Sequence, residues 1–135
     1  MVSPAPLRIV FLGTPDFAVP TLEALLASRH QVVAVITQPD RPRGRGQKVI
    51  DGAVKARALA AGLPVLQPPT LKAPEFLETL RAMQADLGVV AAYGKILSET
   101  VIWTPRLGMI NVHASLLPKY RGAAPIHRAV AAGER

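Results

Sequence analysis

Short runs of apolar residues alternate along the chain with segments whose apolar positions recur at helical spacing. Strands are predicted where the runs are densest, at residues 7–12, 31–36, 63–66, 87–92 and 109–113. Apolar residues fill these runs with little alternation, which is typical of strands buried on both faces of a parallel sheet.

Helices are predicted between these strands, at residues 18–26, 53–61, 74–84 and about 124–132. Thr14 or Asp16 can cap the first helix, Gly62 can end the second, and Pro74 lies in the first turn of the third. Strands that alternate with helices predict an α/β fold, a Rossmann-like parallel sheet with helices on both faces. No strand follows the last helix, so we expect a sheet that is truncated before its last strands.

Composition places the chain among small folded proteins. It has 135 residues, half of them hydrophobic, which suits one domain with a modest core. There is no cysteine, and the histidines at positions 30, 113 and 127 are too far apart for a zinc cluster, so no metal site is expected. The start lacks the features of a signal peptide, and no apolar run is long enough to span a bilayer, so a cytoplasmic protein is expected.

One loop carries closely spaced cations. The formal net charge is +7, and residues 37–48 alone hold the cations Arg41, Arg43, Arg45 and Lys48. Prolines and glycines between these cations argue against a helix or strand in this segment. Two interpretations stay open: a solvated charged loop, or a loop that follows a phosphate backbone. The loop holds no aromatic residue that could stack on a base, so base-specific recognition is not indicated.

Gly13 follows the first predicted strand, where a dinucleotide-binding fold would carry three glycines. Here the sequence has one glycine only, and Gly44 and Gly46 do not open a helix. A nicotinamide dinucleotide site is therefore not supported. Gly13 fits a sharp turn and a ligand-facing position equally well.

Asn111 and His113 form a polar pair at the end of the fifth predicted strand. Alternating side chains put both on one face, with Cα atoms roughly 6–7 Å apart. An asparagine amide can donate to a developing oxyanion, and a histidine can move protons near neutral pH. Alternatively, both residues merely bond to neighbouring loops, and for an isolated Asn-x-His that is the commoner case.

The continuation of this strand resembles a known signature. Asn111-Val112-His113-Ala114-Ser115-Leu116-Leu117-Pro118 is similar to the catalytic segment of the folate-dependent formyltransferases. The segment Gly13-Thr14-Pro15-Asp16-Phe17, and Thr37-Gln38-Pro39-Asp40-Arg41-Pro42 with Gly44-Arg45-Gly46, resemble the branch of this family that acts on methionyl initiator tRNA. The resemblance extends over essentially the whole chain.

The resemblance implies a transferase of one-carbon metabolism that serves translation initiation. It would move a formyl group from 10-formyltetrahydrofolate to the α-amine of methionyl initiator tRNA. Asn111 and His113 would be catalytic, and Phe17 would lie near the methionyl side chain unless it packs on the first helix. The folate would contact Ser115, Leu116, Leu117, Pro118, Tyr93, Gly94, Ile96 and Leu97. The tRNA acceptor arm would contact Arg41, Arg43, Arg45 and Lys48.

Parts of the family pattern are missing. The family pairs its Asn and His with an Asp farther along, yet residues 114–135 contain no Asp. We therefore expect residues 1–135 to be an incomplete amino-terminal catalytic domain without the tRNA-binding carboxy-terminal domain. Such a fragment should be inactive alone, and the full-length enzyme is expected to be a monomer.

Two other functions stay open. One is a formyltransferase that acts on a small amine such as glycinamide ribonucleotide, although four clustered cations are not needed for such a substrate. The other is a non-catalytic α/β module that binds RNA or a nucleotide.

Overall fold

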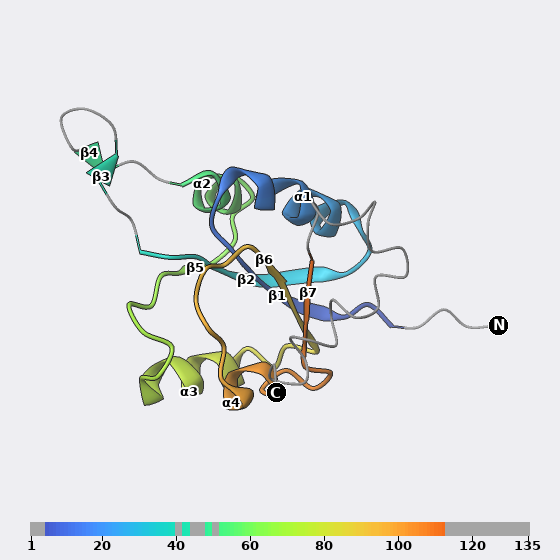
Figure 1. Ribbon diagram of the computed structural model, residues 1–135. Helices are drawn as coiled ribbons and strands as arrows, with labels where there is room; N and C mark the ends of the chain where they lie inside the picture. The colour runs from blue at the N-terminus through green and yellow to red at the C-terminus, as the bar shows by residue number, and fades with distance from the viewer. Residues whose placement is uncertain (1–4, 40–41, 44–47, 50–51, 113–135) are drawn as a thin grey trace, which may run out of the picture.

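A five-stranded parallel sheet organises the fold (Figure 1). The computed structural model describes residues 5–39, 42–43, 48–49 and 52–112. The strands of this sheet are β1 (Arg8–Gly13), β2 (Gln31–Ile36), β5 (Val65–Leu66), β6 (Leu87–Ala91) and β7 (Met109–Asn111). They lie in the order β5-β2-β1-β6-β7, and each adjacent pair is parallel.

Helices cover both faces of this sheet. The short 3-10 helix η1 (Asp16–Ala18) leads into α1 (Val19–Ala27), which lies with α2 (Ala53–Ala60) on one face. The helices α3 (Pro74–Ala82) and α4 (Glu99–Ile102) lie on the other face (Figure 1). The predicted α/β class, with a parallel sheet and helices on both faces, is confirmed.

The central strand β1 contributes to two separate cores because its side chains alternate between the faces. Ile9 and Phe11 are buried with residues of α1 and α2, whereas Val10 and Leu12 are buried with residues of α3 and α4. A strand that is buried on both sides must be apolar at nearly every position, which explains the unbroken run in the sequence.

Two elements differ from the sequence-based expectations. The four-residue helix α4 was not predicted, because it is too short to show a helical period. Its N-cap Ser98 accepts a hydrogen bond from the backbone of Val101 at 3.2 Å, and Val101 and Ile102 are buried. The predicted strand at residues 63–66 is shortened to Val65–Leu66, because the Leu63 amide instead bonds to the carbonyl of Ala58 at the end of α2.

The expectation that the basic loop contains no strand is wrong. Two short strands, β3 (Pro42–Arg43) and β4 (Lys48–Val49), pair antiparallel, with Arg43 opposite Lys48. Proline is tolerated here because it begins the strand of a two-stranded ribbon, where its missing N–H breaks no ladder. The ribbon lies apart from the five-stranded sheet (Figure 1). The helix that was predicted at about residues 124–132 lies outside the described residues.

Candidate functional site

The carboxyl ends of the five parallel strands meet at one edge of the sheet. The register there aligns one residue from each strand in a row: Leu66, Ile36, Leu12, Val90 and Asn111. After β1 the chain continues to β2 on one side, and the later strands β6 and β7 lie on the other side. Open α/β sheets bind ligands outside the carboxyl ends of their strands at such a reversal.

Asn111 is the polar member of this row. It ends β7, is half-buried, and lies opposite Val90 in the register. Met109 is buried in the core under α3 and α4, whereas Ile110 and Val112 pack against the core under α1 and α2. Alternation therefore assigns Asn111 to the α3/α4 side of the sheet.

Several predicted site residues belong to segments outside the described residues. His113, Ser115, Leu116, Leu117 and Pro118 lie outside the described residues. The same holds for Arg41 and Arg45 of the basic segment. Arg43 and Lys48 are described only as backbone, in β3 and β4.

Gly13 ends β1 where three elements come close together. A Cβ atom at this position would lie 2.8 Å from the carbonyl oxygen of Ala91 and 3.1 Å from the Cβ of Ala18. Packing of β6 and η1 against β1 therefore requires the glycine. No ligand needs to be invoked to explain the residue type.

The loop after β6 holds four of the predicted folate-binding residues. Tyr93 and Leu97 pack against the α3/α4 core, whereas Ile96 is 95% exposed. The Tyr93 side chain is buried, and its hydroxyl has no hydrogen-bond partner within the described structure. Burial raises the pKa of Tyr93 to about 12, because the phenolate would lose its hydration. Gly94 is exposed and has a φ of +93°.

A polar network joins the ends of β1, β2, β5 and β6, and the sequence did not reveal it. The Thr14 hydroxyl accepts hydrogen bonds from the backbone N–H of Gln38 (3.2 Å) and from the Thr37 hydroxyl (3.3 Å). It donates a hydrogen bond to the Tyr93 carbonyl (3.3 Å). The Gln38 side chain donates to the same carbonyl at 2.9 Å, and the Gln67 side chain donates to the Gln38 carbonyl at 3.1 Å. The available signal was a Thr or Gln directly after each of the strands β1, β2 and β5.

Phe17 lies on η1, beside the carboxyl end of β1. Its side chain is 66% exposed, so it is not part of the core that α1 covers. An exposed aromatic ring at this edge is available to contact a bound molecule.

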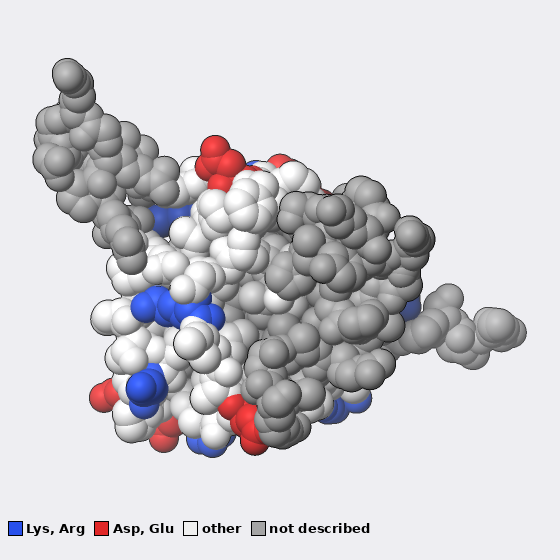
Figure 2. Space-filling view, in the orientation of Figure 1, with Lys and Arg blue, Asp and Glu red and all other residues white. Residues whose placement is uncertain are grey.

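Charges on the described body are mixed. On the face in Figure 2, Lys and Arg side chains lie among Asp and Glu side chains, with no single basic patch outside the grey residues. Arg57 on α2 donates to both carboxylate oxygens of Glu23 on α1, at 2.6 and 3.1 Å. The hydrogen bond from Arg57 holds the pKa of Glu23 below its usual value. The closely spaced cations at positions 41–48 are therefore a feature of the sequence, and no counterpart to them shows on this face of the described body.

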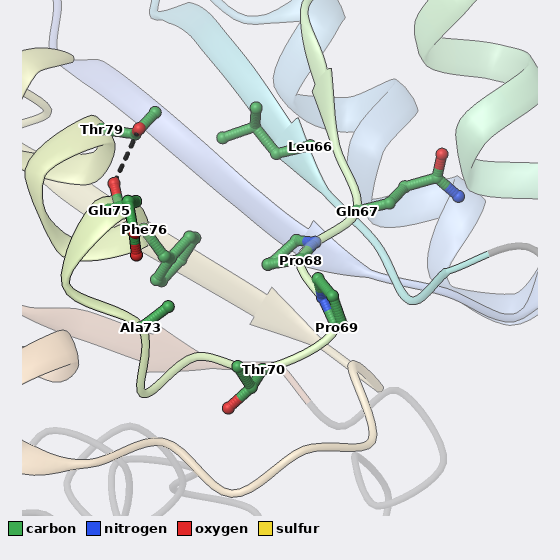
Figure 3. A pocket seen from close by; sticks show the side chains of 9 residues that line it. All are labelled: Leu66, Gln67, Pro68, Pro69, Thr70, Ala73, Glu75, Phe76 and Thr79. Atoms are coloured by element: carbon green, nitrogen blue, oxygen red, sulfur yellow. Dashed lines mark hydrogen bonds between the residues drawn. The ribbon is translucent and has the colours of Figure 1, made fainter.

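A separate cavity of about 390 Å³ lies between the end of β5 and α3 (Figure 3). Its walls include the apolar side chains of Leu66, Pro68, Pro69 and Phe76, while the Gln67 side chain points away from it. Lys95 donates to the carbonyl of Pro69 at 3.0 Å, which links this wall to the loop after β6. None of the residues predicted to form the site lines this cavity.

Metal-binding clusters and membrane-spanning helices are both absent from the described part of the chain. Within it, no group of three or more His, Asp or Glu side chains is arranged to hold a metal ion. Nor does any helix in that part combine the length and apolar character that crossing a membrane requires.

Residues 7–135 match a protein family described as formyl transferase. The chain is 62% identical over 128 residues to a methionyl-tRNA formyltransferase from Moorella thermoacetica, covering 95% of this chain and 41% of that protein. It is 63% identical over 129 residues to a methionyl-tRNA formyltransferase from Pseudomonas syringae pv. tomato, with 96% and 41% covered. The chain thus spans 41% of the length of these curated relatives.

Solved structures show the same fold. A phosphoribosylglycinamide formyltransferase from Bacillus halodurans superposes with a TM-score of 0.56 at 20% identity, covering 93% of this chain and 65% of that one. A glycinamide ribonucleotide transformylase 1 from Symbiobacterium toebii gives 0.57 at 21% identity, with 89% and 60% covered. At this identity the likeness concerns the fold alone.

Proposed function

The chain belongs to the formyl transferase family, and from that premise we propose that it is the amino-terminal catalytic part of a methionyl-tRNA formyltransferase. The enzyme would transfer a formyl group from 10-formyltetrahydrofolate to the α-amine of methionyl initiator tRNA. The observation that carries this proposal is the identity of 60–63% over at least 95% of the chain to relatives with that name. The half-buried Asn111 at the carboxyl edge of the sheet supports it.

The proposed chemistry is an attack by a neutral amine on the formyl carbon. A new C–N bond forms, and the carbonyl oxygen becomes an oxyanion. The Asn111 amide donates to this oxyanion, a contact worth about 3–4 kcal/mol in comparable sites. The bond from the formyl carbon to the folate nitrogen then breaks, and His113 carries the proton of the attacking amine to that nitrogen. Binding both substrates in one site supplies much of the remaining rate.

The folate would bind between the loop after β6 and residues Ser115, Leu116, Leu117 and Pro118. Two observations support a ligand beside Tyr93, Gly94, Ile96 and Leu97. Tyr93 and Leu97 pack on the α3/α4 side of the sheet, the side that alternation assigns to Asn111. Ile96 is 95% exposed, and a ring system laid on the loop would remove this apolar side chain from water. The folate acts as the formyl donor, and no metal takes part.

The tRNA would be held by its acceptor arm. Arg41, Arg43, Arg45 and Lys48 would contact its phosphates, and the position of the β3–β4 ribbon away from the sheet supports this (Figure 1). The exposed ring of Phe17 would lie beside the methionyl thioether, a favourable contact for an aromatic face. The enzyme would act as a monomer in the cytoplasm, where initiator tRNA is used.

Substrate choice tests this function. Because the chain spans 41% of its relatives, residues 1–135 would be joined to the remaining part of the Moorella thermoacetica relative, and we call this protein the chimaera. We expect the chimaera to formylate charged initiator tRNA in the presence of 10-formyltetrahydrofolate, and not glycinamide ribonucleotide. The 135-residue chain alone should formylate neither. Formylation of glycinamide ribonucleotide alone would contradict the proposal, and tRNA formylation by the chain alone would refute the need for a second part.

A further inference from the structure

The backbone of the loop after β6 adopts a conformation that Ala92 does not favour by itself. Ala92 has a φ of +58° although it is not a glycine, and Gly94 has a φ of +93°. Glycine adopts a positive φ at no steric cost, but at a residue such as Ala92 this conformation persists only when surrounding groups fix it. Tyr93 lies between the two, so the groups that hold Tyr93 determine the path of the loop.

Two side chains hold the backbone of Tyr93. Its carbonyl oxygen accepts one hydrogen bond from the side-chain amide of Gln38 at 2.9 Å and one from the Thr14 hydroxyl at 3.3 Å. These two bonds use both lone pairs of the oxygen. The tyrosine ring is buried in the α3/α4 core, so the residue is fixed on both its backbone and its side chain.

Gln38 is itself fixed from several directions. Its backbone N–H donates to Thr14 after β1, and its carbonyl accepts from Gln67 after β5. Its side-chain nitrogen lies so close to Gly94 that a Cβ atom at that glycine would collide with it. A glycine at position 94 is therefore needed twice, for the positive φ and for the space that the Gln38 amide occupies.

From this geometry we propose that Gln38 is a positioning residue that sets the conformation of residues 93–97 for binding of the formyl donor. Gln38 acts through the Tyr93 carbonyl and does not itself contact the folate. The proposal rests on the proposed function of this loop as part of the folate site. It adds a residue that lies outside the proposed folate contacts, two positions beyond the end of β2.

The test uses substitutions in the chimaera that remove the donor and keep the length of the side chain. In Gln38→Met we expect the KM for 10-formyltetrahydrofolate to rise roughly 3- to 10-fold, the equivalent of one net hydrogen bond. The KM for charged initiator tRNA should stay within twofold. Thr14→Val removes the other donor to the Tyr93 carbonyl and should also raise the KM for 10-formyltetrahydrofolate. Thr14→Ser keeps the hydroxyl, so its KM for 10-formyltetrahydrofolate should match that of the parent chimaera.

Gln67→Met is the matched control, because Gln67 also donates a side-chain amide to a backbone carbonyl in this network but does not bond to Tyr93. It should leave the folate KM within twofold. A folate KM that does not change in Gln38→Met would overturn the proposal. So would an equal rise of both KM values, because that result indicates a general loss of structure.

A second measurement keeps this inference separate from the proposed function. Amide hydrogen exchange of residues 93–97 should be faster in Gln38→Met than in the parent chimaera, and unchanged in Gln67→Met. Exchange needs no activity, so it tests Gln38 even if the chimaera formylates nothing and the proposed function fails. Unaltered exchange in Gln38→Met would overturn the positioning role whatever the activity.

Discussion

Asn111 lies directly opposite Val90 in the parallel register of β6 and β7, and this pairing sets where the proposed chemistry takes place. Val90 in turn lies opposite Leu12 of β1. Two strand spacings of about 4.8 Å therefore separate Asn111 from the end of β1, roughly 10 Å across the sheet. A donor bound beside the loop after β6 and an acceptor near Phe17 would flank the strand ends between them.

Tyr93 provides a test of the core below the proposed site. Its buried hydroxyl has no hydrogen-bond partner in the part of the chain that the structure describes, and such a group costs stability. Tyr93→Phe should therefore raise the free energy of unfolding at pH 7 by about 1 kcal/mol, measured by urea denaturation. A loss of similar size would mean that the hydroxyl has a partner.

Because of Tyr93, we also expect the free energy of unfolding to depend on pH in the alkaline range. Burial raises the pKa of Tyr93 to about 12, whereas an unfolded tyrosine titrates near 10. The fold thus favours the neutral phenol, and this contribution is fully present below about pH 10 and is lost as the pH rises through about 12. Between these values the parent should lose up to about 2–3 kcal/mol relative to Tyr93→Phe. Parallel pH profiles would show that the phenol is not desolvated.

Asp86 should give the opposite pH dependence, because its contribution to the free energy of unfolding is lost at acid pH. The Arg8 amide at 2.8 Å and then the Arg106 guanidinium at 3.1 Å hold the pKa of this carboxylate below its usual value. Its stabilisation is present above the unfolded pKa of about 3.9 and is lost as the pH falls through the lower folded value. Asp86→Asn should therefore be less stable than the parent at pH 7, with a gap that narrows below about pH 4.

Salt separates the two contacts of Asp86. Its pair with Arg106 is exposed, so 1 M NaCl should weaken that contribution, whereas the bond from the Arg8 backbone should persist. We expect part of the gap between Asp86→Asn and the parent to remain in salt. Complete loss of the gap would show that the backbone bond contributes nothing.

Most of the fold could be predicted from the sequence, because central parallel strands need unbroken apolar runs and β1, β2 and β6 have them. Length limited what periodicity could reveal: α4 has four residues and β3 and β4 two each, too few to repeat a pattern. The Thr14–Gln38–Tyr93 network escaped prediction for another reason. Thr14 and Tyr93 are 79 residues apart and meet only because of the strand order.

The candidate site was predictable only in part. The Asn111 position followed from the strand alternation and from the motif that continues it. The burial of Tyr93 did not, because an aromatic residue next to a glycine in a loop gives no sign that its ring returns to the core. His113 and the residues after it lie outside the described part, so their roles stay proposals.

The basic segment should govern tRNA binding. Replacing Arg41, Arg43, Arg45 and Lys48 with Ala in the chimaera should weaken tRNA binding. It should also reduce the slope of log K against log salt by up to about 0.7–0.9 for each cation. The measurement is the Kd for charged initiator tRNA at several salt concentrations from about 50 to about 200 mM, from which the slope is determined.

A control replaces three exposed cations of the described body, Arg29, Lys72 and Arg81, with Ala, and its slope change is compared per cation removed. Their loss should leave the slope nearly unchanged. An unchanged slope in the variant of the basic segment would instead favour a small amine as the acceptor.

The most direct test of the proposed chemistry is the single-turnover rate of formyl transfer to charged initiator tRNA by the chimaera with Asn111→Ala. Loss of the oxyanion donor should lower this rate about 10²- to 10³-fold. Gln84→Ala removes an exposed side-chain amide near the amino ends of β1 and β6, at the far end of the strands from Asn111. This control should leave the rate within twofold. If Asn111→Ala transfers the formyl group as fast as the parent, Asn111 does not stabilise the transition state and the proposed mechanism is wrong.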